Sequence, residues 1–242
     1  MVYWPLAGND STRYVMLIAS LPVHGRLFTQ NQTPLSRARL ERRLKLMTPD
    51  DRALLAEVER VLRWDALPGA AGDADMIRRA KDLLARLSAD GLTTLETAVQ
   101  NRLELRTVVA ALRRRHVGLD PPESETTLGV GRWNRRILRN WDVRDFGLSI
   151  PFPWIGEAVD LLETDDPLNL EKLLLGRAWL DLRRLAAGHD FDLTGVVLYV
   201  LRWDIVDRWT RRGAEAAQAR YDALLADGLE DHDTLFDASE AA

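Results

Sequence analysis

The sequence predicts an all-α fold, a multi-helix bundle divided into two lobes. Apolar residues recur at helical spacing along most of the chain, and several of these segments open with a capping residue followed by proline. Glycines follow the predicted helices at their carboxyl ends, a position where glycine commonly terminates a helix. With 242 residues, of which 46% are hydrophobic, the chain is long enough to bury a substantial core.

The first part of the chain contains one ambiguous apolar run and two clear helix signals. Residues 13–22 ("RYVMLIASLP") fit a helical period at some positions and strand alternation at others, so both structures remain open, with helix preferred. The next segment is predicted to begin with Thr33 as the N-cap and Pro34 at the first helical position. Thr48 and Pro49 repeat that signal for the helix that follows.

Two longer helices are predicted next. The first begins at Asp73 or Asp75. The second, "TTLETAVQNRLELRTVVAALRRRHVG", covers residues 93–118, with a threonine as its cap and Gly118 as its stop. Three consecutive arginines lie in its last turn, where the negative end of the helix dipole favours cations.

A loop rich in proline and acidic residues, "LDPPESETTLG" at residues 119–129, is the predicted boundary between the lobes. The amino-terminal helical lobe is therefore assigned to residues 1–120 and the carboxyl-terminal helical lobe to residues 121–228. Residues 229–242 form an acidic tail, which we expect to be disordered.

The second lobe is predicted to contain three long helices. The first covers residues 166–187 and ends at Gly188. The next begins with Asp192 as its cap after a short connection, which favours an antiparallel helix pair. A final helix covers residues 214–228.

Composition and missing motifs exclude several classes of function. The net charge is −4, which argues against a general nucleic-acid binder, although arginine outnumbers lysine 30 to 3. The chain has no cysteine, so thiol nucleophiles and zinc–thiolate sites are excluded. It contains no phosphate-binding loop, dinucleotide fingerprint, nucleophile elbow or zinc-protease motif. We therefore expect no catalytic residues, no cofactor, no metal and no small-molecule substrate.

The amino terminus and the apolar runs bear on location. The first residues lack the basic and apolar regions of a secretory signal. The longest apolar run, "VVLYVL" at residues 196–201, is far shorter than the roughly 20 residues that a spanning helix needs. We therefore expect a protein that does not span a membrane.

Two acidic stretches have an alternative interpretation as metal sites. His189 and Asp190 could ligate a metal, but a turn between helices explains them more simply. Asp165 and Asp166 resemble the aspartate cluster that binds magnesium diphosphate in isoprenoid synthases. Asn169 stands where a further aspartate would complete that cluster, and helix capping before a proline is the preferred explanation.

The most distinctive stretch is "GRWNRRILRNWDVRDFG", residues 131–147, which carries five arginines and two tryptophans. On a helix, one side would hold the apolar anchors Trp133, Ile137 and Trp141. The opposite arc would hold the four arginines of a predicted partner-binding surface, Arg132, Arg135, Arg136 and Arg139. The tryptophans do not alternate with the arginines, as stacking on single-stranded nucleic acid would require. A solvated helix face and a docking surface for an acidic protein both remain open.

Several stretches together resemble a known family. They are "YVMLIASLP", "LSRARLERRLKLMTPDDRALL", "NRLELRTVVAALRRR", "WDVRDFGL" with "FPWI", and "VLYVLRWDIVDRW" before "YDALLADGL". These stretches, spread over residues 14–228, resemble an uncharacterised bacterial family encoded among the subunits of V-type (V/A-type) ATPases. That family is similar to a short form of the C-type stalk subunit of these ATPases, whose eukaryotic counterpart is the d-type stalk subunit.

The resemblance implies a non-catalytic, all-α subunit of the central stalk in an ion-transporting complex. Its partners would be other ATPase subunits, the rotating shaft and the membrane ring. Its location would be cytoplasmic, peripheral on the cytoplasmic face of the inner membrane. The C-type stalk subunit has three similar helical repeats, whereas this chain offers two echoes, "TVVAALRRR" and "GVVLYVLRW". The resemblance carries no catalytic or cofactor residue to this chain.

Three functional hypotheses follow. The first is the central-stalk subunit, which gene neighbourhood would support. The second is a soluble α-helical adaptor that docks an acidic partner unrelated to rotary ATPases. The third is an enzyme of the isoprenoid-synthase kind that uses Asp165 and Asp166, which magnesium-dependent diphosphate binding would reveal.

Overall fold

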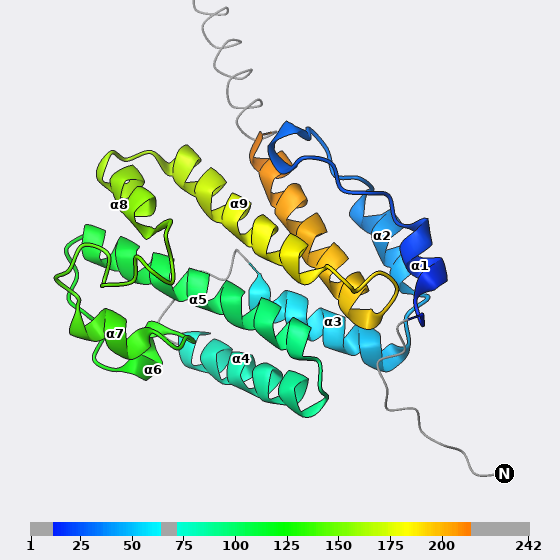
Figure 1. Cartoon of the computed structure of the whole chain (residues 1–242), viewed down its shortest axis with the longest axis horizontal. Helices are drawn as coiled ribbons and strands as arrows, with labels where there is room; N and C mark the ends of the chain where they lie inside the picture. Colours follow the sequence, from blue (N-terminus) through cyan, green and yellow to red (C-terminus); the bar gives the residue numbers. More distant parts are fainter. Residues whose placement is uncertain (1–11, 64–71, 214–242) are drawn as a thin grey trace, which may run out of the picture.

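The computed structural model describes residues 12–63 and 72–213, and within them the chain forms helices and loops with no β-strand. The predicted all-α fold is confirmed. Figure 1 shows the long helix α5 crossing the middle of the molecule, with the other helices packed around it. The predicted helix at residues 214–228 and the acidic tail at 229–242 lie outside the described residues.

The ambiguous run at residues 13–22 contains a short helix, α1 (Val15–Ser20), so the preferred structure is confirmed. A single 3₁₀ turn, η1 (Leu27–Thr29), follows, and then α2 (Arg37–Leu44). Helix α2 begins later than the Thr33–Pro34 signal predicted, with Ser36 at the N-cap position. The physical reason lies in Leu35, which is buried and whose carbonyl accepts the indole N–H of Trp203 at 2.8 Å, so this segment is held outside the helix.

The capping signal at Thr48 is confirmed. Helix α3 (Pro49–Leu62) begins directly after it, and the Thr48 side chain accepts the backbone N–H of Asp51. Helix α4 (Gly72–Ala89) and helix α5 (Thr93–His116) follow, close to their predicted ranges. The expected threonine cap of α5 is wrong, because Leu92 occupies the N-cap position and the Thr94 hydroxyl contacts His189 instead.

The predicted loop between the lobes contains a short helix, α6 (Glu125–Leu128), and is followed by α7 (Asn134–Arg139). Gly129 connects the two helices with φ +141°, and a Cβ there would lie 2.5 Å from the Thr107 hydroxyl of α5. Only glycine lets the chain pass so close to α5. This close approach sets the position of α7 on the surface.

The remaining helices are α8 (Ile155–Glu163), α9 (Pro167–Leu185) and a helix over residues 193–213. Asp166 caps α9, as predicted, by accepting the backbone N–H of Asn169. Asp192 accepts the backbone N–H of Gly195 at 2.8 Å and so caps the last helix. The short connection turns the chain back, so that helix 193–213 returns beside α9 (Figure 1).

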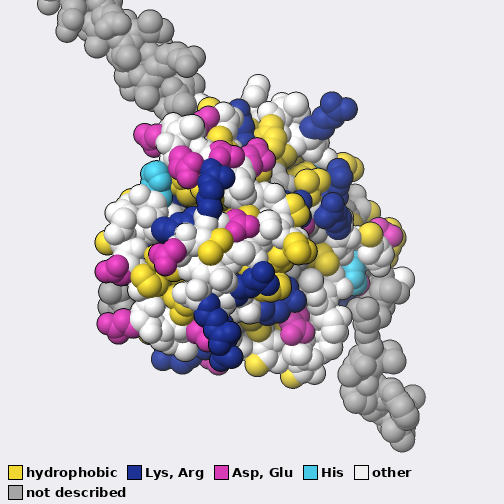
Figure 2. All heavy atoms as spheres, turned by 60° about the vertical axis from the view of Figure 1, so that its left-hand side comes forward, with side chains coloured by type: hydrophobic (Ala, Val, Ile, Leu, Met, Phe, Trp, Pro, Cys, Tyr) yellow, Lys and Arg dark blue, Asp and Glu magenta, His cyan; other side chains and the backbone are white. Residues whose placement is uncertain are grey.

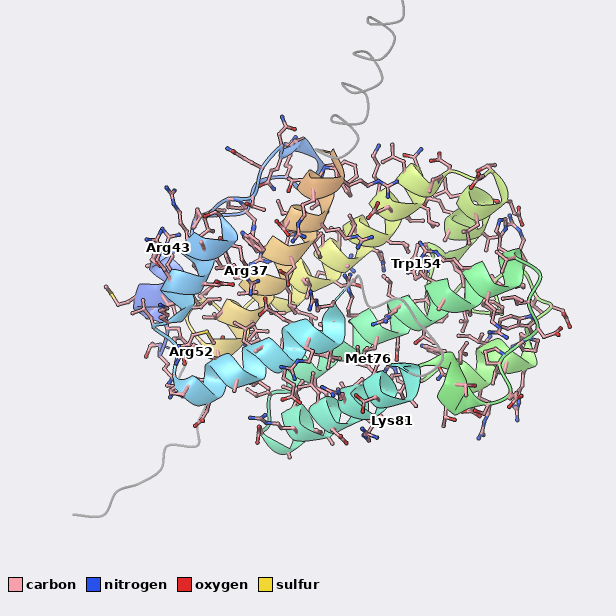
Figure 3. All side chains as sticks on the ribbon, turned by 180° about the vertical axis from the view of Figure 1, so that it is seen from behind. Arg37, Arg43, Arg52, Met76, Lys81 and Trp154 are labelled. Atoms are coloured by element: carbon pink, nitrogen blue, oxygen red, sulfur yellow. The ribbon has the colours of Figure 1, made fainter. Side chains whose placement is uncertain are left out.

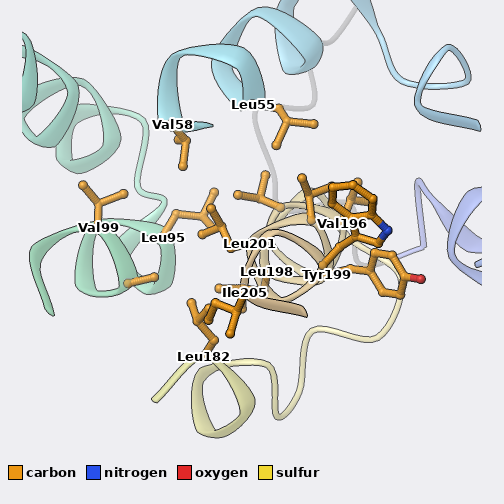
Figure 4. Packing of buried hydrophobic residues seen from close by; sticks show 14 of the residues in the cluster. Leu55, Val58, Leu95, Val99, Leu182, Val196, Leu198, Tyr199, Leu201 and Ile205 are labelled. Carbon is orange, nitrogen blue, oxygen red and sulfur yellow. The ribbon is translucent and has the colours of Figure 1, made fainter. Parts of the chain in front are cut away.

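Two hydrophobic clusters form the core. The larger joins α1–α4, the first half of α5, the second half of α9 and helix 193–213. Figure 4 shows helix 193–213 in its middle, with Leu55 and Val58 of α3, Leu95 of α5 and Leu182 of α9 around it. The smaller cluster joins the second half of α5 to α6–α8 and the first half of α9.

These clusters do not coincide with the predicted lobes 1–120 and 121–228. Helices α5 and α9 are long enough to contribute to both clusters, and helix 193–213 packs with the amino-terminal helices. The two clusters therefore follow one another along α5 and α9, each taking one half of both helices. The loop at residues 119–129 contributes Leu128 to the smaller cluster.

Candidate functional site

The arginine-rich stretch forms the surface at the far end of α5, and its apolar residues anchor it. Ile137 is fully buried and Trp141 is 8% exposed, both in the smaller cluster. Trp133 is half-buried and its ring meets that of Phe152 edge-on, with the ring centroids 6.3 Å apart. Helix α7 is shorter than the sequence pattern suggests, yet the predicted division into a buried side and an exposed side is present in the structure.

Arg132 has a partner inside the chain. Its guanidinium donates to the carboxylate of Glu104 on α5, with Nε–Oε1 at 2.7 Å and Nη2–Oε2 at 3.2 Å. Glu104 is only 2% exposed, and it also accepts the side-chain amide of Gln100. Burial alone would raise the pKa of Glu104, but the hydrogen bonds from Arg132 and Gln100 outweigh burial and hold the pKa below its usual value. Arg132 thus neutralises a buried charge.

Arg135 and Arg144 also have acidic neighbours in the chain. Arg135 donates to Glu125 of α6 at 2.9 Å, which raises the pKa of the arginine. Arg144 bonds to Asp160 and to Glu163 of α8, the latter at 2.9 Å. Because these pairs are exposed to solvent, each contributes little to stability. The first links α7 to α6, and the second links the segment after α7 to α8.

Arg136 and Arg139 differ from their neighbours. Both are exposed, and among the described residues neither forms an ion pair. Arg136 lies over Gly147, where a Cβ would come within 3.4 Å of its guanidinium. Arg139 lines a shallow hollow of about 420 Å³, and Leu119, Leu138 and Trp141 also line it. Both cations therefore face solvent, and Arg139 shares the hollow with the exposed side chain of Leu119.

Arg115, in the last turn of α5, holds the chain beyond α7 in place. Its guanidinium donates to the backbone carbonyls of Trp141, Val143 and Arg144, and it lies over the ring of Phe146 at 4.3 Å. Phe146 has a positive φ of 53°, so a strained backbone is held here by several contacts. The sequence signal for this residue is the run of three arginines, which by itself indicated only an interaction with the helix dipole.

Figure 2 shows the molecule turned so that this end of it comes forward. Basic side chains occur over most of this face, several of them together in its lower middle, with hydrophobic and acidic side chains between them. Mixed basic and apolar surface of this kind is typical of protein-binding regions, in which arginine is enriched.

A second candidate region, which the sequence did not reveal, is a cleft of about 950 Å³ bordered by α2, α3, α5, α9 and helix 193–213. The lining of this central cleft includes Asp204, whose carboxylate lies 3.7 Å from the guanidinium of Arg37 on α2. Burial, reinforced by the nearby charge of Glu59, raises the pKa of Asp204 to about 7. Arg102 of α5 lies in the same cleft, and burial lowers its pKa.

The other carboxylates of the cleft are engaged by arginines. Glu59 accepts Arg37 at 2.7 Å, and Glu171 of α9 accepts Arg208 at 2.7 Å and also binds Arg212. These pairs join α2 to α3, and α9 to helix 193–213. No single stretch predicts the cleft, because its residues come from five helices and become neighbours only in the fold.

The predicted alternatives for metal binding have structural roles. His189 Nδ1 lies 2.6 Å from Asp192 and its Nε2 lies 3.0 Å from the Thr94 hydroxyl, so both ring nitrogens have partners. Asp166 caps α9, and Asp165 stands in the turn before it with φ +49°. Within residues 12–63 and 72–213, no group of three or more His, Cys, Asp and Glu side chains is arranged to hold a metal ion.

Among the described helices, none has the length and the apolar character that crossing a bilayer requires. Comparison with protein-family models, with curated proteins and with solved structures gives no significant match. The function must therefore be argued from the surface and the cleft of this chain.

Proposed function

We propose that the protein is a non-catalytic, protein-binding subunit, and that the assembly it joins is a V/A-type rotary ATPase. Within that assembly it takes a central-stalk position between the rotating shaft and the membrane ring, at the cytoplasmic face of the membrane. The docking surface is the arginine face of α7, with Arg136 and Arg139 at its centre and Arg132 and Arg135 at its margin.

One observation carries the protein-binding part of this proposal. Two exposed arginines, Arg136 and Arg139, have no described ion-pair partner, and they stand on a helix anchored through buried Ile137 and Trp141. Because the backbone of this helix is already held in place, binding of an acidic partner would have to order only the two arginine side chains. Opposite charge on the partner would also speed association.

The resemblance to the ATPase-associated family supports the choice of assembly. The stretch "NRLELRTVVAALRRR", which carries much of that resemblance, lies within α5, the helix that supplies residues to both hydrophobic clusters. The all-α fold is what a relative of the C-type stalk subunit would have. In the central cleft, Glu59 and Glu171 are held by arginines, which favours a structural role for these carboxylates.

The alternative is an adaptor that uses the same arginine face to dock an acidic protein unrelated to rotary ATPases. The same observation supports both functions, because it identifies the charge of the partner and not its identity. The two are separated by what co-purifies with the protein.

The test is affinity purification of the tagged full chain from its native cells, with identification of the bound proteins by mass spectrometry. We expect the catalytic and stalk subunits of the ATPase to be recovered at low salt and to be lost as salt rises, since charge pairs are screened over about 8–10 Å at physiological ionic strength. Recovery of other acidic proteins without ATPase subunits would favour the adaptor.

The variant that tests the surface is Arg136→Glu with Arg139→Glu. Its matched control is Arg52→Glu with Lys81→Glu, which changes the net charge equally at two exposed positions on α3 and α4, both labelled in Figure 3. We expect the first variant to lose the ATPase subunits and the control to keep them, with both folded by circular dichroism. Equal recovery with the two variants would show that α7 is not the docking surface.

A further inference from the structure

The central cleft, with a volume of about 950 Å³, has more positive than negative side chains in its wall. Among the described residues that line it, seven are arginines and five are aspartates or glutamates. Apolar side chains, such as those of Leu62 and Leu185, also contribute to the wall. Cavities of roughly 300–1,000 Å³ are typical of small-molecule sites. The size and the lining of this cleft therefore fit a small molecule that carries negative charge.

The arginines of the cleft lie nearer to solvent than the carboxylates that they bind. Glu171 is 11% exposed, whereas its partners Arg208 and Arg212 are 33% and 38% exposed. Glu59 is 18% exposed, and Arg37, which donates to it at 2.7 Å, is 42% exposed. A guanidinium group has five N–H donors, so one that binds a carboxylate retains donors for a second anion. A molecule that enters the cleft therefore meets guanidinium groups more than carboxylates.

Two further arginines of the cleft have no described acidic partner. Arg60 and Arg63 lie at the carboxyl end of α3, both are exposed, and neither forms an ion pair within the described ranges. The helix dipole favours cations at this end of a helix, but it supplies only a partial charge. Because these exposed side chains line the cleft, solvent and solutes reach the cleft from this side.

Asp204, in the same wall, makes the charge of the cleft depend on pH. Its carboxylate lies 3.7 Å from Arg37 and is 31% exposed. Burial, with the charge of Glu59, raises the pKa of Asp204 to about 7. The charged groups that line the cleft around it are Arg37 of α2, Glu59 of α3, Arg102 of α5, Glu171 and Asp181 of α9, and Asp207 of its own helix. Protonation of Asp204 near neutral pH therefore leaves the cleft more positive.

We propose that the central cleft binds a phosphate monoester, with the phosphate group on the arginines and the organic part against the apolar wall. A phosphate monoester carries about 1.5–2 negative charges at neutral pH. This charge matches the surplus of two arginines over carboxylates in the described lining. Arginine binds phosphate through paired, charge-assisted hydrogen bonds. Arg60 and Arg63 supply the positive charge that no described carboxylate neutralises.

The cleft favours this ligand over an inorganic anion and over an acidic protein segment. An inorganic anion would fill only a small part of about 950 Å³ and would leave Leu62 and Leu185 without a contact. A stable protein interface is usually much broader than a single cleft, at about 800 Å² on each partner. The site uses none of the arginines of α7, so it does not depend on which assembly the protein joins.

The probe is phenyl phosphate, and its binding to the full chain is measured by isothermal titration calorimetry at pH 7. Inorganic phosphate is the comparison. We expect phenyl phosphate to bind with a Kd of about 1 mM or lower. Inorganic phosphate should bind at least about fivefold more weakly, because the ring of the monoester buries apolar surface.

The variant that tests the cations is Arg60→Gln with Arg63→Gln, which should weaken binding of phenyl phosphate at least about tenfold. The matched control is Arg52→Gln with Lys81→Gln, which removes two exposed positive charges at positions of α3 and α4 outside the described lining. Affinity should change less than about twofold in this control, since solvent and salt screen such distant charges. Circular dichroism verifies that both variants are folded.

The variant Asp204→Asn tests the role of pH. Phenyl phosphate itself titrates near neutral pH, so the native chain and the variant are compared at each pH. At pH 6 the two should bind alike. At pH 8 the variant should bind at least about twofold more tightly, because ionised Asp204 repels the phosphate in the native chain. A rise of half a pKa unit in Asp204 when the ligand binds is enough for that difference.

Four results would overturn the proposal. The first is no binding of phenyl phosphate at millimolar concentration. The second is equal affinity for inorganic phosphate, which would assign the cleft to a free inorganic anion. The third is an equal loss of affinity in the two double glutamine variants. The fourth is an affinity ratio between Asp204→Asn and the native chain that is the same at pH 6 and pH 8. The variant Arg136→Glu with Arg139→Glu should bind phenyl phosphate like the native chain, so failure of this site and failure of the α7 surface are distinguishable.

Discussion

Replacing Arg132 by methionine removes one half of the ion pair that joins the segment just before α7 to α5, and it keeps most of the aliphatic stem. Glu104, the other half, is 2% exposed and loses the two hydrogen bonds that its carboxylate accepts from the Arg132 guanidinium, while the backbone N–H of residue 132 still lies 3.3 Å from Glu104 Oε1. The bond from Gln100 at 2.8 Å remains. A buried carboxylate is thus left with too few donors.

The magnitude follows from the exposure of the two partners. Breaking a fully buried pair costs about 3–5 kcal/mol. The Arg132 side chain is 67% exposed, however, so solvent screens the pair and water can reach part of the space that it leaves. We therefore expect a loss of about 1.5–3 kcal/mol, the range for hydrogen bonds to charged groups. For a chain of this length that loss lowers Tm by about 3–12 °C.

The dependence on pH identifies Glu104 as the cause. The pKa of Glu104 is held below its ordinary value of 4.5 in the folded protein, so its contribution to stability is fully present above that value. The contribution is lost as pH falls through the folded pKa. The gap in free energy of unfolding between the native chain and Arg132→Met should therefore be full at pH 7 and should narrow in acid.

The assay is urea denaturation of the native chain, Arg132→Met, Glu104→Gln and the double variant, at pH 7 and in acid. In the double variant no charge is buried, so Glu104→Gln should restore part of the stability that Arg132→Met loses. A pH-independent effect of Arg132→Met, or additive losses in the double variant, would refute the reasoning.

Asp204→Asn is expected to stabilise the protein at pH 8, and the gain should shrink as the pH falls from about 7 toward 4, as measured by denaturation. The folded pKa of Asp204, about 7, lies above its ordinary value of 3.8, so ionisation of this group destabilises the folded protein. This destabilisation is absent at low pH and complete above pH 7. A gain in stability that is constant with pH would contradict this reasoning. Gly195→Ala should cost at least about 1–3 kcal/mol, because the new Cβ would overlap the carbonyl oxygen of His189, whereas Gly156→Ala in α8 has open space and should be neutral or slightly stabilising. Thermal unfolding that ranks these two variants the other way would show that the close approach at Gly195 is not rigid. Trp141→Ala should cost about 3–5 kcal/mol, because the ring is 8% exposed, while Arg136→Glu with Arg139→Glu should change stability by less than about 0.5 kcal/mol. Unfolding of that double variant would place the arginines in the core structure instead of a docking surface.

Local sequence signals located most of the helices, because capping and apolar periodicity are properties of neighbouring residues. Thr48, Asp166 and Asp192 cap the helices that the sequence assigned to them. The start of α2 was misplaced because Leu35 is fixed by the indole of Trp203, which is remote in sequence. A contact between residues so far apart leaves no mark in the local pattern.

The candidate sites show the same limit. The sequence placed Ile137 and Trp141 on the buried side and the arginines on the exposed side, which one helical period is enough to predict. It did not predict that Arg132 pairs with Glu104, because a buried glutamate within an apolar helix cannot be recognised until its neighbours are known. For the same reason the central cleft was found only in the structure.

Helix α5 explains why the two ends of the molecule should behave as one unit. Its first half packs in the larger cluster and its second half in the smaller one, so a change in either cluster acts on the same helix. Glu104 sits near its middle and holds Arg132, and Arg115 at its end holds the carbonyls that follow α7. The proposed docking surface is therefore joined to α5 at two points. A load applied to the arginine face would pass along α5 to the helices bordering the central cleft, since a continuous helix packed on both sides transmits strain with little deformation. A subunit that carries torque between partners needs this stiffness, and an adaptor that only tethers two proteins does not.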